Sequence, residues 1–202
     1  MATIESSLKN MLLTLFIITA IAGTSLGFVY KLTEKPIAEA KARKQQEAIK
    51  QVVPEFSNNP AEEAVEVTSS EGLPIKLFPA KKDGKLVGVA VETASNKGFA
   101  GNVSIMVGFK PDGTIVNYQV LEHKETPGLG TKMDKWFKTD KGNQSIIGKN
   151  PGSYKLIVTK DGGQVDAITA ATISSRAFLD AVRIGYKSFM ENKSKLEEGG
   201  AQ

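Results

Sequence analysis

The sequence contains no cysteine, and its 202 residues include a single histidine, His123. Without thiolates the chain forms no disulfide. With one imidazole it also lacks the ligands of an iron–sulfur cluster, or of a zinc site with the usual ligand count. Any redox chemistry that this protein performs must therefore come from an organic cofactor.

Hydrolase and nucleic-acid signals are also weak. No Gly-x-Ser-x-Gly elbow joins a strand to a helix, and a Ser or Thr hydrolase would depend on His123 as its only histidine base. The net charge of +4 arises from 26 basic and 22 acidic residues, and the lysines are spread along the chain. We therefore expect no nucleic-acid partner. The length suits one domain with an anchor or linker.

The longest uncharged segment lies near the N-terminus. Residues 10–30 contain no charged side chain, and about 20 helical residues are needed to cross the hydrocarbon core of a membrane. We predict a transmembrane helix over 10–30, preceded by a cytoplasmic tail of residues 1–9. The alternative is a secretory signal peptide, because Ala20-Ile21-Ala22 resembles a cleavage site. Apolar residues continue to Val29, which favours an uncleaved anchor.

The basic residues that flank this segment leave its orientation open. Only Lys9 precedes it, whereas five basic residues follow it closely: Lys31, Lys35, Lys41, Arg43 and Lys44. A count of positive charges would therefore keep the C-terminal side in the cytoplasm. However, long domains are translocated largely regardless of charge, and two glutamates are interleaved with these residues.

A polar helix and a linker are predicted next, over residues 31–72. Thr33 is suited to cap a helix, Pro36 suits an early helical position, and Pro54 ends the pattern after Val53. We interpret this helix as a solvated stalk that lifts the domain off the bilayer, in preference to a specific binding face. Residues 55–72 are rich in Asn, Glu and Ser, which is typical of a linker or peripheral loop.

A mixed α+β domain is predicted over residues 73–192. Short β-type runs alternate with Asp-Gly turns, which indicates hairpins in a mostly antiparallel sheet: 75–78, 86–94, 103–109 and 114–122. Residues 123–136 begin with a Thr-Pro-Gly turn and continue as a short helix. Two further runs follow at 155–159 and 165–169, and residues 174–192 have helical apolar spacing. Residues 193–202 form a flexible tail.

The segment 166–175 lies where the last strand meets the last helix. A helix N-terminus offers unpaired N–H groups and a positive dipole end, so a phosphate beside Thr172 would meet backbone donors. Ala170 and Ala171 leave room for it, and Thr169, Ser174 and Ser175 add hydroxyl groups. Asp166 would order the turn or position the Thr172 hydroxyl. A simpler interpretation makes Thr172 or Ser174 an ordinary N-cap.

This segment resembles a motif of a known family, the FMN-binding domain of the G subunit of Rnf electron-transport complexes and of the C subunit of sodium-pumping NADH:quinone reductase. The family motif is Asp-x-x-Ser/Thr-Gly/Ala-Ala-Thr-x-Ser/Thr. The resemblance implies that a flavin transferase esterifies Thr172 with FMN taken from FAD. Ser-Gly is the commoner pair where this chain has Thr169-Ala170, a mild departure that keeps a hydroxyl and a small residue.

A second resemblance lies upstream, in residues 123–130, which are similar to the loop on the flavin side of that family. The turn at Pro127-Gly128 permits close backbone approach to a ring. Glu125 and Thr126 supply polar groups for the flavin edges, and Leu129 supplies an apolar contact. An ordinary Pro-Gly loop is the competing interpretation. For His123, a structural hydrogen-bonding role is favoured over proton transfer.

The resemblance covers residues 75–192 and implies a function. The short anchor and compact domain are closer to the Rnf G subunit than to the longer quinone-reductase subunit. We therefore expect a covalent-FMN electron carrier in an ion-translocating ferredoxin:NAD oxidoreductase, a translocase subunit that does not turn over alone. The resemblance also places the domain on the periplasmic side of the inner membrane, among other complex subunits. The alternatives are the equivalent quinone-reductase subunit and a cofactor-free membrane-anchored adaptor, and visible absorbance distinguishes the adaptor from a flavoprotein.

Overall fold

The computed structural model describes residues 7–69 and 71–198, which form an α+β fold. The chain divides into two compact units, one up to Arg43 and the other from Lys44 onward. Helix α1 (Leu8–Val52) begins in the first unit and ends in the second, and the sheet and the remaining helices belong to the second unit. Each unit is described by itself.

Helix α1 runs without interruption from Leu8 to Val52. The prediction of a separate stalk helix capped by Thr33 is therefore wrong. The Thr33 hydroxyl donates to the carbonyl oxygen of Val29 at 2.8 Å, as a residue inside a helix does. Pro36 removes one backbone hydrogen bond, but good helix formers around it continue the helix. The helix ends shortly before Pro54, as predicted.

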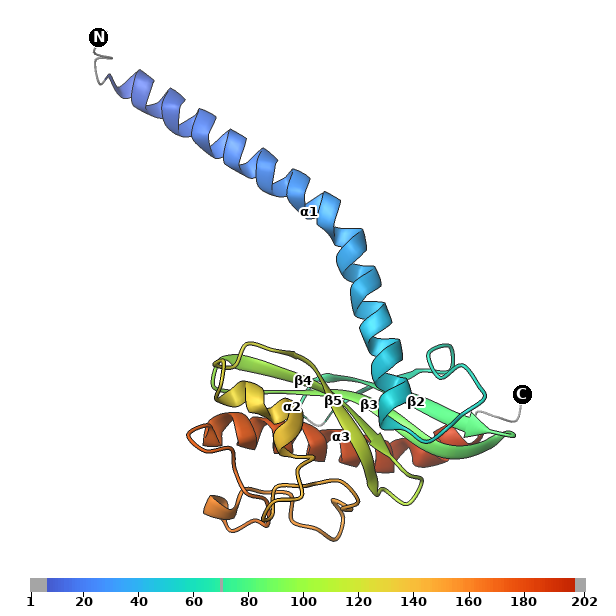
Figure 1. The fold of residues 1–202 in the computed structure, drawn as a ribbon. Coiled ribbons are helices and arrows are strands. Elements are labelled where there is room, and N and C mark those ends of the chain that lie inside the picture. Colours follow the sequence, from blue (N-terminus) through green and yellow to red (C-terminus); the bar gives the residue numbers. More distant parts are fainter. Residues whose placement is uncertain (1–6, 70, 199–202) are drawn as a thin grey trace. The chain divides into compact units, whose positions relative to one another are not determined.

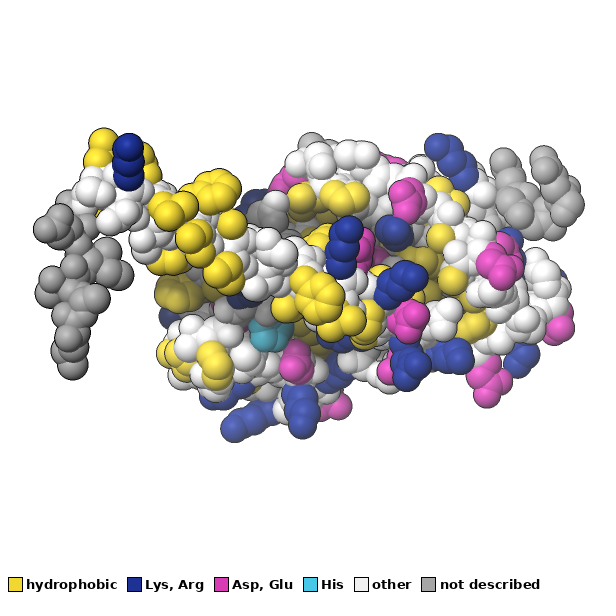
Figure 2. Space-filling model, turned by 90° about the horizontal axis from the view of Figure 1, so that it is seen from above, with side chains coloured by type: hydrophobic (Ala, Val, Ile, Leu, Met, Phe, Trp, Pro, Cys, Tyr) yellow, Lys and Arg dark blue, Asp and Glu magenta, His cyan; other side chains and the backbone are white. Residues whose placement is uncertain are grey.

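In the first unit, α1 is apolar and exposed. An 18-residue window of the helix has a mean hydropathy of 2.1, and none of that window is buried. Figure 2 shows apolar side chains, in yellow, at the surface of this segment. Such a surface is unfavourable in water and suits a lipid environment. Length and composition thus make it a candidate membrane anchor. Residues 1–6 of the predicted cytoplasmic tail lie outside the described residues.

Five antiparallel strands in the order β1-β2-β3-β4-β5 form the sheet (Figure 1). They are β1 (Val65–Thr68), β2 (Pro74–Lys82), β3 (Lys85–Gly98), β4 (Gly101–Phe109) and β5 (Ile115–His123). The predicted antiparallel hairpins are confirmed, and the turn between β2 and β3 uses positive φ angles at Asp83 and Gly84. Strand β1 corrects the prediction of a linker or loop over 55–72. Its four residues alternate Val with polar side chains and pair with the edge of β2.

Helix α3 (Thr172–Glu198) covers one face of the sheet (Figure 1). Its apolar face, which includes Phe178 and Phe189, packs against alternate residues of the strands, such as Val91 and Ile105. The predicted last helix is confirmed, but it is longer than predicted. The helix continues through residues 193–198 of the predicted flexible tail, where the buried Leu196 packs it against the core. Residues 199–202 of that tail lie outside the described residues.

The last turns of α1 cover the opposite face of the sheet within the second unit. Ile49 and Val52 are buried against Phe78, Ala90 and Met106. A Cβ atom at Gly108 of β4 would collide with the carbonyl group of Val52, so glycine permits this close approach. The interpretation of residues 31–53 as a solvated stalk is therefore wrong from Lys44 onward, because this part of the helix completes a second apolar core.

The segment between β5 and α3 has little regular structure. It contains the 3-10 helix η1 (Gly130–Lys132), helix α2 (Met133–Trp136) and the 3-10 helix η2 (Thr159–Asp161). The predicted turn and short helix within 123–136 are confirmed. The two strands predicted at 155–159 and 165–169 are wrong, because these runs share only one parallel bridge, Val158 with Val165. Both valines are buried in the main core, so their β-type pattern reflects burial.

Candidate functional site

The start of α3 depends on an unusual backbone conformation. Ala170 has a φ angle of 62°, a left-handed conformation that alanine rarely adopts. This residue turns the chain so that the N–H of Ala171 bonds to the carbonyl of Ile168 at 3.0 Å and α3 starts at Thr172. The first N–H groups of a helix have no acceptor within the helix, and the helix dipole adds positive potential there. The predicted anion-binding segment therefore lies at a true helix N-terminus.

The hydroxyl groups of this segment have different environments. The buried Ser175 hydroxyl accepts from the N–H of Ile168 and donates to the carbonyl of Ala171, each at 2.9 Å. The Ser174 hydroxyl is buried and donates to the Glu125 carboxylate. Thr172 is half-buried, and its hydroxyl lies 3.5 Å from the Lys160 ammonium group. The serine hydroxyls thus support the local fold, whereas the Thr172 hydroxyl remains accessible.

Glu125 joins three segments around this helix start. Its side chain is buried, with 4% of the residue exposed, and its carboxylate accepts from the Ala100 N–H at 3.1 Å and from the Ser174 hydroxyl. A Cβ atom at Gly98 would lie 2.6 Å from Oε1 of Glu125, and one at Gly130 would lie 2.6 Å from its Cβ. Two glycines therefore make room for this carboxylate. It lies inside the protein, whereas the sequence predicted contact with a flavin edge.

The loop after β5 contains a tight turn. The N–H of Leu129 donates to the carbonyl of Thr126 at 3.1 Å, Pro127 follows Thr126, and Gly128 has a φ angle of 74°. Proline in the second position and a positive φ in the third are typical of a type II turn. The Gly128 N–H donates to the Thr131 hydroxyl at 3.0 Å, which fixes the turn from the following residues.

His123 makes a structural hydrogen bond. Its Nδ1 atom accepts from the N–H of Glu125 at 3.2 Å and so helps to hold the entry to the loop. This contact supports the structural interpretation of His123.

Asp166 holds a neighbouring loop. Its Oδ2 atom accepts from the N–H of Asn143 at 2.8 Å, and its carbonyl accepts from Nε1 of Trp136 at 2.9 Å. These contacts join Asp166 to the loop around residues 136–143, so its predicted roles at the turn before α3 and at the Thr172 hydroxyl stay predictions.

A cavity of about 350 Å3 opens beside Thr172 and brings the two predicted segments together. Six of the predicted site residues line it: Thr126, Leu129, Ala170, Ala171, Thr172 and Ser174. Thr169, Glu125 and Gly128 are outside this lining, although Glu125 and Gly128 shape the loops that form it. The volume falls within the range of pockets that hold organic ligands, and Thr172 offers both a hydroxyl and helix N–H donors to a phosphate.

Sequence reasoning missed Phe99, which also lines the cavity. Phe99 lies in the turn between β3 and β4 and is 68% exposed, which is unusual for a large aromatic residue. The N–H of the next residue, Ala100, is held by Glu125. The available signal was an aromatic residue in a glycine-rich hairpin turn, Gly98-Phe99-Ala100-Gly101, where no core position is expected.

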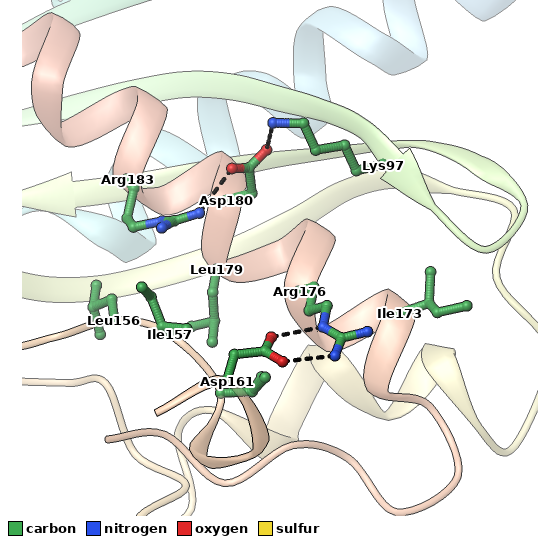
Figure 3. A pocket seen from close by; sticks show the side chains of 10 residues that line it. Lys97, Leu156, Ile157, Asp161, Ile173, Arg176, Leu179, Asp180 and Arg183 are labelled. Carbon is green, nitrogen blue, oxygen red and sulfur yellow. Dashed lines mark hydrogen bonds and ion pairs between the residues drawn. The ribbon is translucent and has the colours of Figure 1, made fainter. Parts of the chain in front are cut away.

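A second cavity, also of about 350 Å3, shares the lining residue Ile173 with the first, and Figure 3 shows the residues around this second cavity. Its rim is charged. Asp180 bonds to Ser95 at 2.9 Å, to Lys97 at 2.9 Å and to Arg183 at 2.8 Å. Burial acts to raise the pKa of Asp180, but the hydrogen bonds from Lys97 and Ser95 outweigh it and keep the pKa below its ordinary value. Across 7–69 and 71–198, no cluster of three potential metal ligands occurs.

Comparisons with known proteins agree with this geometry. Residues 98–187 match the family model of the FMN-binding domain, and this range contains every residue that lines the cavity beside Thr172. The chain is 33% identical to the G subunit of the ion-translocating oxidoreductase complex of Haemophilus influenzae strain PittEE, over 92% of this chain and 97% of that relative. A protein of the same name from Vibrio cholerae is 32% identical, over 89% of this chain and 90% of its own length. One from Erwinia tasmaniensis is 37% identical, over 84% of this chain and 84% of its own length.

Proposed function

Because the chain belongs to the family of G subunits of ion-translocating oxidoreductase complexes, we propose that it is the flavin-carrying electron-transfer subunit of an Rnf-type complex. We propose further that FMN is attached to Thr172 as a phosphoester. The observation that supports this site most directly is the contrast among three hydroxyls. Those of Ser174 and Ser175 are buried and donate to acceptors inside the protein, whereas that of Thr172 is half-buried beside an open cavity at a helix N-terminus, with the exposed Lys160 3.5 Å away.

The attachment step is an exchange of phosphate esters. The Thr172 oxygen bonds to the phosphorus of the flavin-side phosphate of FAD, the pyrophosphate P–O bond breaks, and AMP leaves. The hydroxyl proton passes to a base of the flavin transferase or to solvent. No oxidant or reductant is consumed, and the protein gains the mass of FMN less one water. Once bound, FMN supplies the capacity to accept and pass on one or two electrons.

The residues around the cavity would hold and shield the cofactor. The first N–H groups of α3 would donate to the phosphate, since a helix N-terminus binds anions. Ala170 and Ala171 keep the approach to Thr172 free of bulky side chains. Leu129 and Phe99 offer apolar surface to a planar ring, and Thr126 offers a hydroxyl. A covalent bond is useful for a domain outside the cytoplasm, where a lost cofactor is not readily replaced.

The anchor and the compartment form part of the same proposal. We place the apolar part of α1 across the inner membrane as a single pass, with the domain on the periplasmic side and the other subunits of the complex as partners. The apolar helix and the family support this arrangement. Reporters fused after Gln202 test this arrangement. Activity of a fused reporter that works only in the cytoplasm would contradict the orientation. A mature protein that begins near Gly23 would contradict the anchor.

The attachment site is tested with the full-length chain produced together with a flavin transferase. Thr172→Ala removes the hydroxyl, so we expect complete loss of flavin fluorescence in a denaturing gel and loss of the added FMN mass. Ser153→Ala is the matched control, because Ser153 carries an exposed hydroxyl in the same domain but lies outside the 166–175 motif and the cavity lining. This control should remain fully modified, and Thr172→Ser should be modified in part.

A Thr172→Ala protein that keeps covalent flavin would refute the site. If Thr172 served only as a helix cap, its loss would cost about 1 kcal/mol of stability and leave any flavin unaffected. A wild-type chain that carries no flavin mass after production with the transferase would refute the covalent cofactor itself.

A further inference from the structure

Lys160 is the only charged side chain that the described structure places in hydrogen-bonding contact with Thr172. Its ammonium nitrogen lies 3.5 Å from the Thr172 hydroxyl oxygen, although the two residues are twelve positions apart in the sequence. Lys160 is the middle residue of η2 and is exposed. The contact therefore brings a long cationic side chain to the Thr172 hydroxyl at the first residue of α3.

An ion pair holds η2 against the helix. Asp161, the next residue, receives two hydrogen bonds from the Arg176 guanidinium group, each at 2.7 Å (Figure 3). Thr172 and Arg176 are four positions apart in α3 and so lie on one face of the helix, one turn from each other. The hydrogen bonds from Arg176 also hold the pKa of Asp161 below its ordinary value. Two consecutive residues of η2 thus contact the first and second turns of α3.

Within the described residues, most of the basic side chains near this face of α3 form ion pairs, but Lys160 does not. Arg176 is paired with Asp161, and both Lys97 and Arg183 are paired with Asp180. Among residues 7–69 and 71–198, the Lys160 ammonium takes part in no ion pair. It adds its charge to the positive end of the α3 dipole. An unpaired cation beside a helix N-terminus and a reactive hydroxyl favours an anion at this position.

We propose that Lys160 is the counter-cation of the phosphate attached to Thr172, held in place by the Asp161–Arg176 ion pair. The proposal rests on the function proposed above, because it requires the phosphoester. A phosphate esterified to both Thr172 and the riboflavin chain keeps one negative charge. The N–H groups of α3 offer it hydrogen bonds, and Lys160 offers a full positive charge. The same charge attracts the anionic pyrophosphate during attachment and stabilises it as the new bond forms.

Three variants of the full-length chain separate charge from shape. Lys160→Gln removes the charge and keeps much of the length, and Lys160→Arg keeps the charge. Lys155→Gln is the matched control, because Lys155 is an exposed lysine of the same segment whose ammonium lies near Gly162. Each protein is purified after production with the flavin transferase, and the 31P resonance of the attached phosphate is recorded over a range of salt concentrations. The initial rate of flavin attachment is measured in parallel with FAD.

We expect Lys160→Gln to shift the 31P resonance and to abolish most of its dependence on salt, while Lys155→Gln leaves both unchanged. The attachment rate should fall roughly two- to fivefold in Lys160→Gln, as suits an exposed ion pair, and recover in Lys160→Arg. If Lys160→Gln matches Lys155→Gln in resonance and rate, the proposal is overturned. Failure of the phosphoester itself is a separate result, because the wild-type protein would then show no 31P resonance and no flavin mass.

Discussion

The first and second turns of helix α3 show how this domain separates stability from function. In the second turn of α3, Phe178 is fully buried, stacks on Phe137 at 4.4 Å between ring centroids and meets the edge of Tyr118 at 4.7 Å. At its first turn, the same helix borders a cavity, follows a left-handed alanine and depends on the buried carboxylate of Glu125. The aromatic cluster follows the ordinary rules of core packing, whereas the helix start departs from several of them. Such departures concentrate at functional sites.

The largest effect should come from removing an aromatic ring from the core. Phe178→Ala leaves a large void beside the rings of Phe137 and Tyr118, so we expect the free energy of unfolding to fall by about 3–5 kcal/mol. Phe99→Ala makes the same chemical change at the cavity and should cost less than about 0.5 kcal/mol, because Phe99 is mostly exposed. It should instead alter the absorption spectrum of the bound flavin. Denaturant unfolding and visible spectra of the full-length proteins measure both effects. Equal stability losses would contradict the comparison.

The second effect concerns the carboxylate that links the cavity segments. Glu125→Leu leaves the Ala100 N–H and the Ser174 hydroxyl without their buried acceptor, so we expect a loss of roughly 1–3 kcal/mol and a changed flavin spectrum. Glu125→Gln keeps an acceptor and similar volume and should lose much less. Denaturant unfolding and absorption spectra provide the measurements. If the Leu and Gln variants behave alike, the two hydrogen bonds do not organise the cavity.

Local signals in the sequence were sufficient for much of this fold. The Asp-Gly turns predicted the β2–β3 and β4–β5 hairpins, and the helical spacing of apolar residues predicted α3, because both patterns act over a few residues. The same reasoning failed at 155–159 and 165–169. There, Val158 and Val165 are buried by tertiary packing, and an apolar run does not distinguish a strand from a buried loop.

The candidate site was predictable only in part, because some of its residues are brought together by contacts between segments that are far apart in the sequence. The motif around Thr172 and the turn at Gly128 are local features, so the sequence indicated both. Phe99 reaches the cavity, and Lys160 reaches the Thr172 hydroxyl, through contacts between segments that are distant in the sequence, and the sequence pattern did not specify these contacts. The inward position of Glu125 likewise depends on Gly98 and Gly130, which lie on different segments.

A smaller effect should separate backbone strain from proximity to the cofactor. Gly128 and Gly148 have the same φ angle of 74°, and a Cβ atom at either position would meet no atom within 4 Å. Valine at either position should therefore cost about 1–2 kcal/mol through backbone strain alone. Only Gly128→Val should change the spectrum and reduction potential of the flavin, because the turn at Gly128 positions Thr126 and Leu129. Thr172 should remain modified in both variants. Identical flavin spectra would remove this loop from the site.

The smallest effect should be a gain at the strained residue. Alanine in the left-handed conformation costs about 1 kcal/mol, which glycine avoids, although glycine also increases the entropy of the unfolded chain. We therefore expect Ala170→Gly to raise the free energy of unfolding by less than about 1 kcal/mol and to leave flavin attachment intact. Ala171 is the buried next residue and has no positive φ angle, so Ala171→Gly should instead lower the free energy of unfolding. Denaturant unfolding of the unmodified proteins compares the two signs. If both changes lower stability equally, the left-handed conformation of Ala170 stores no strain, and the Thr169-Ala170 departure from the commoner Ser-Gly pair has no energetic consequence for the helix start.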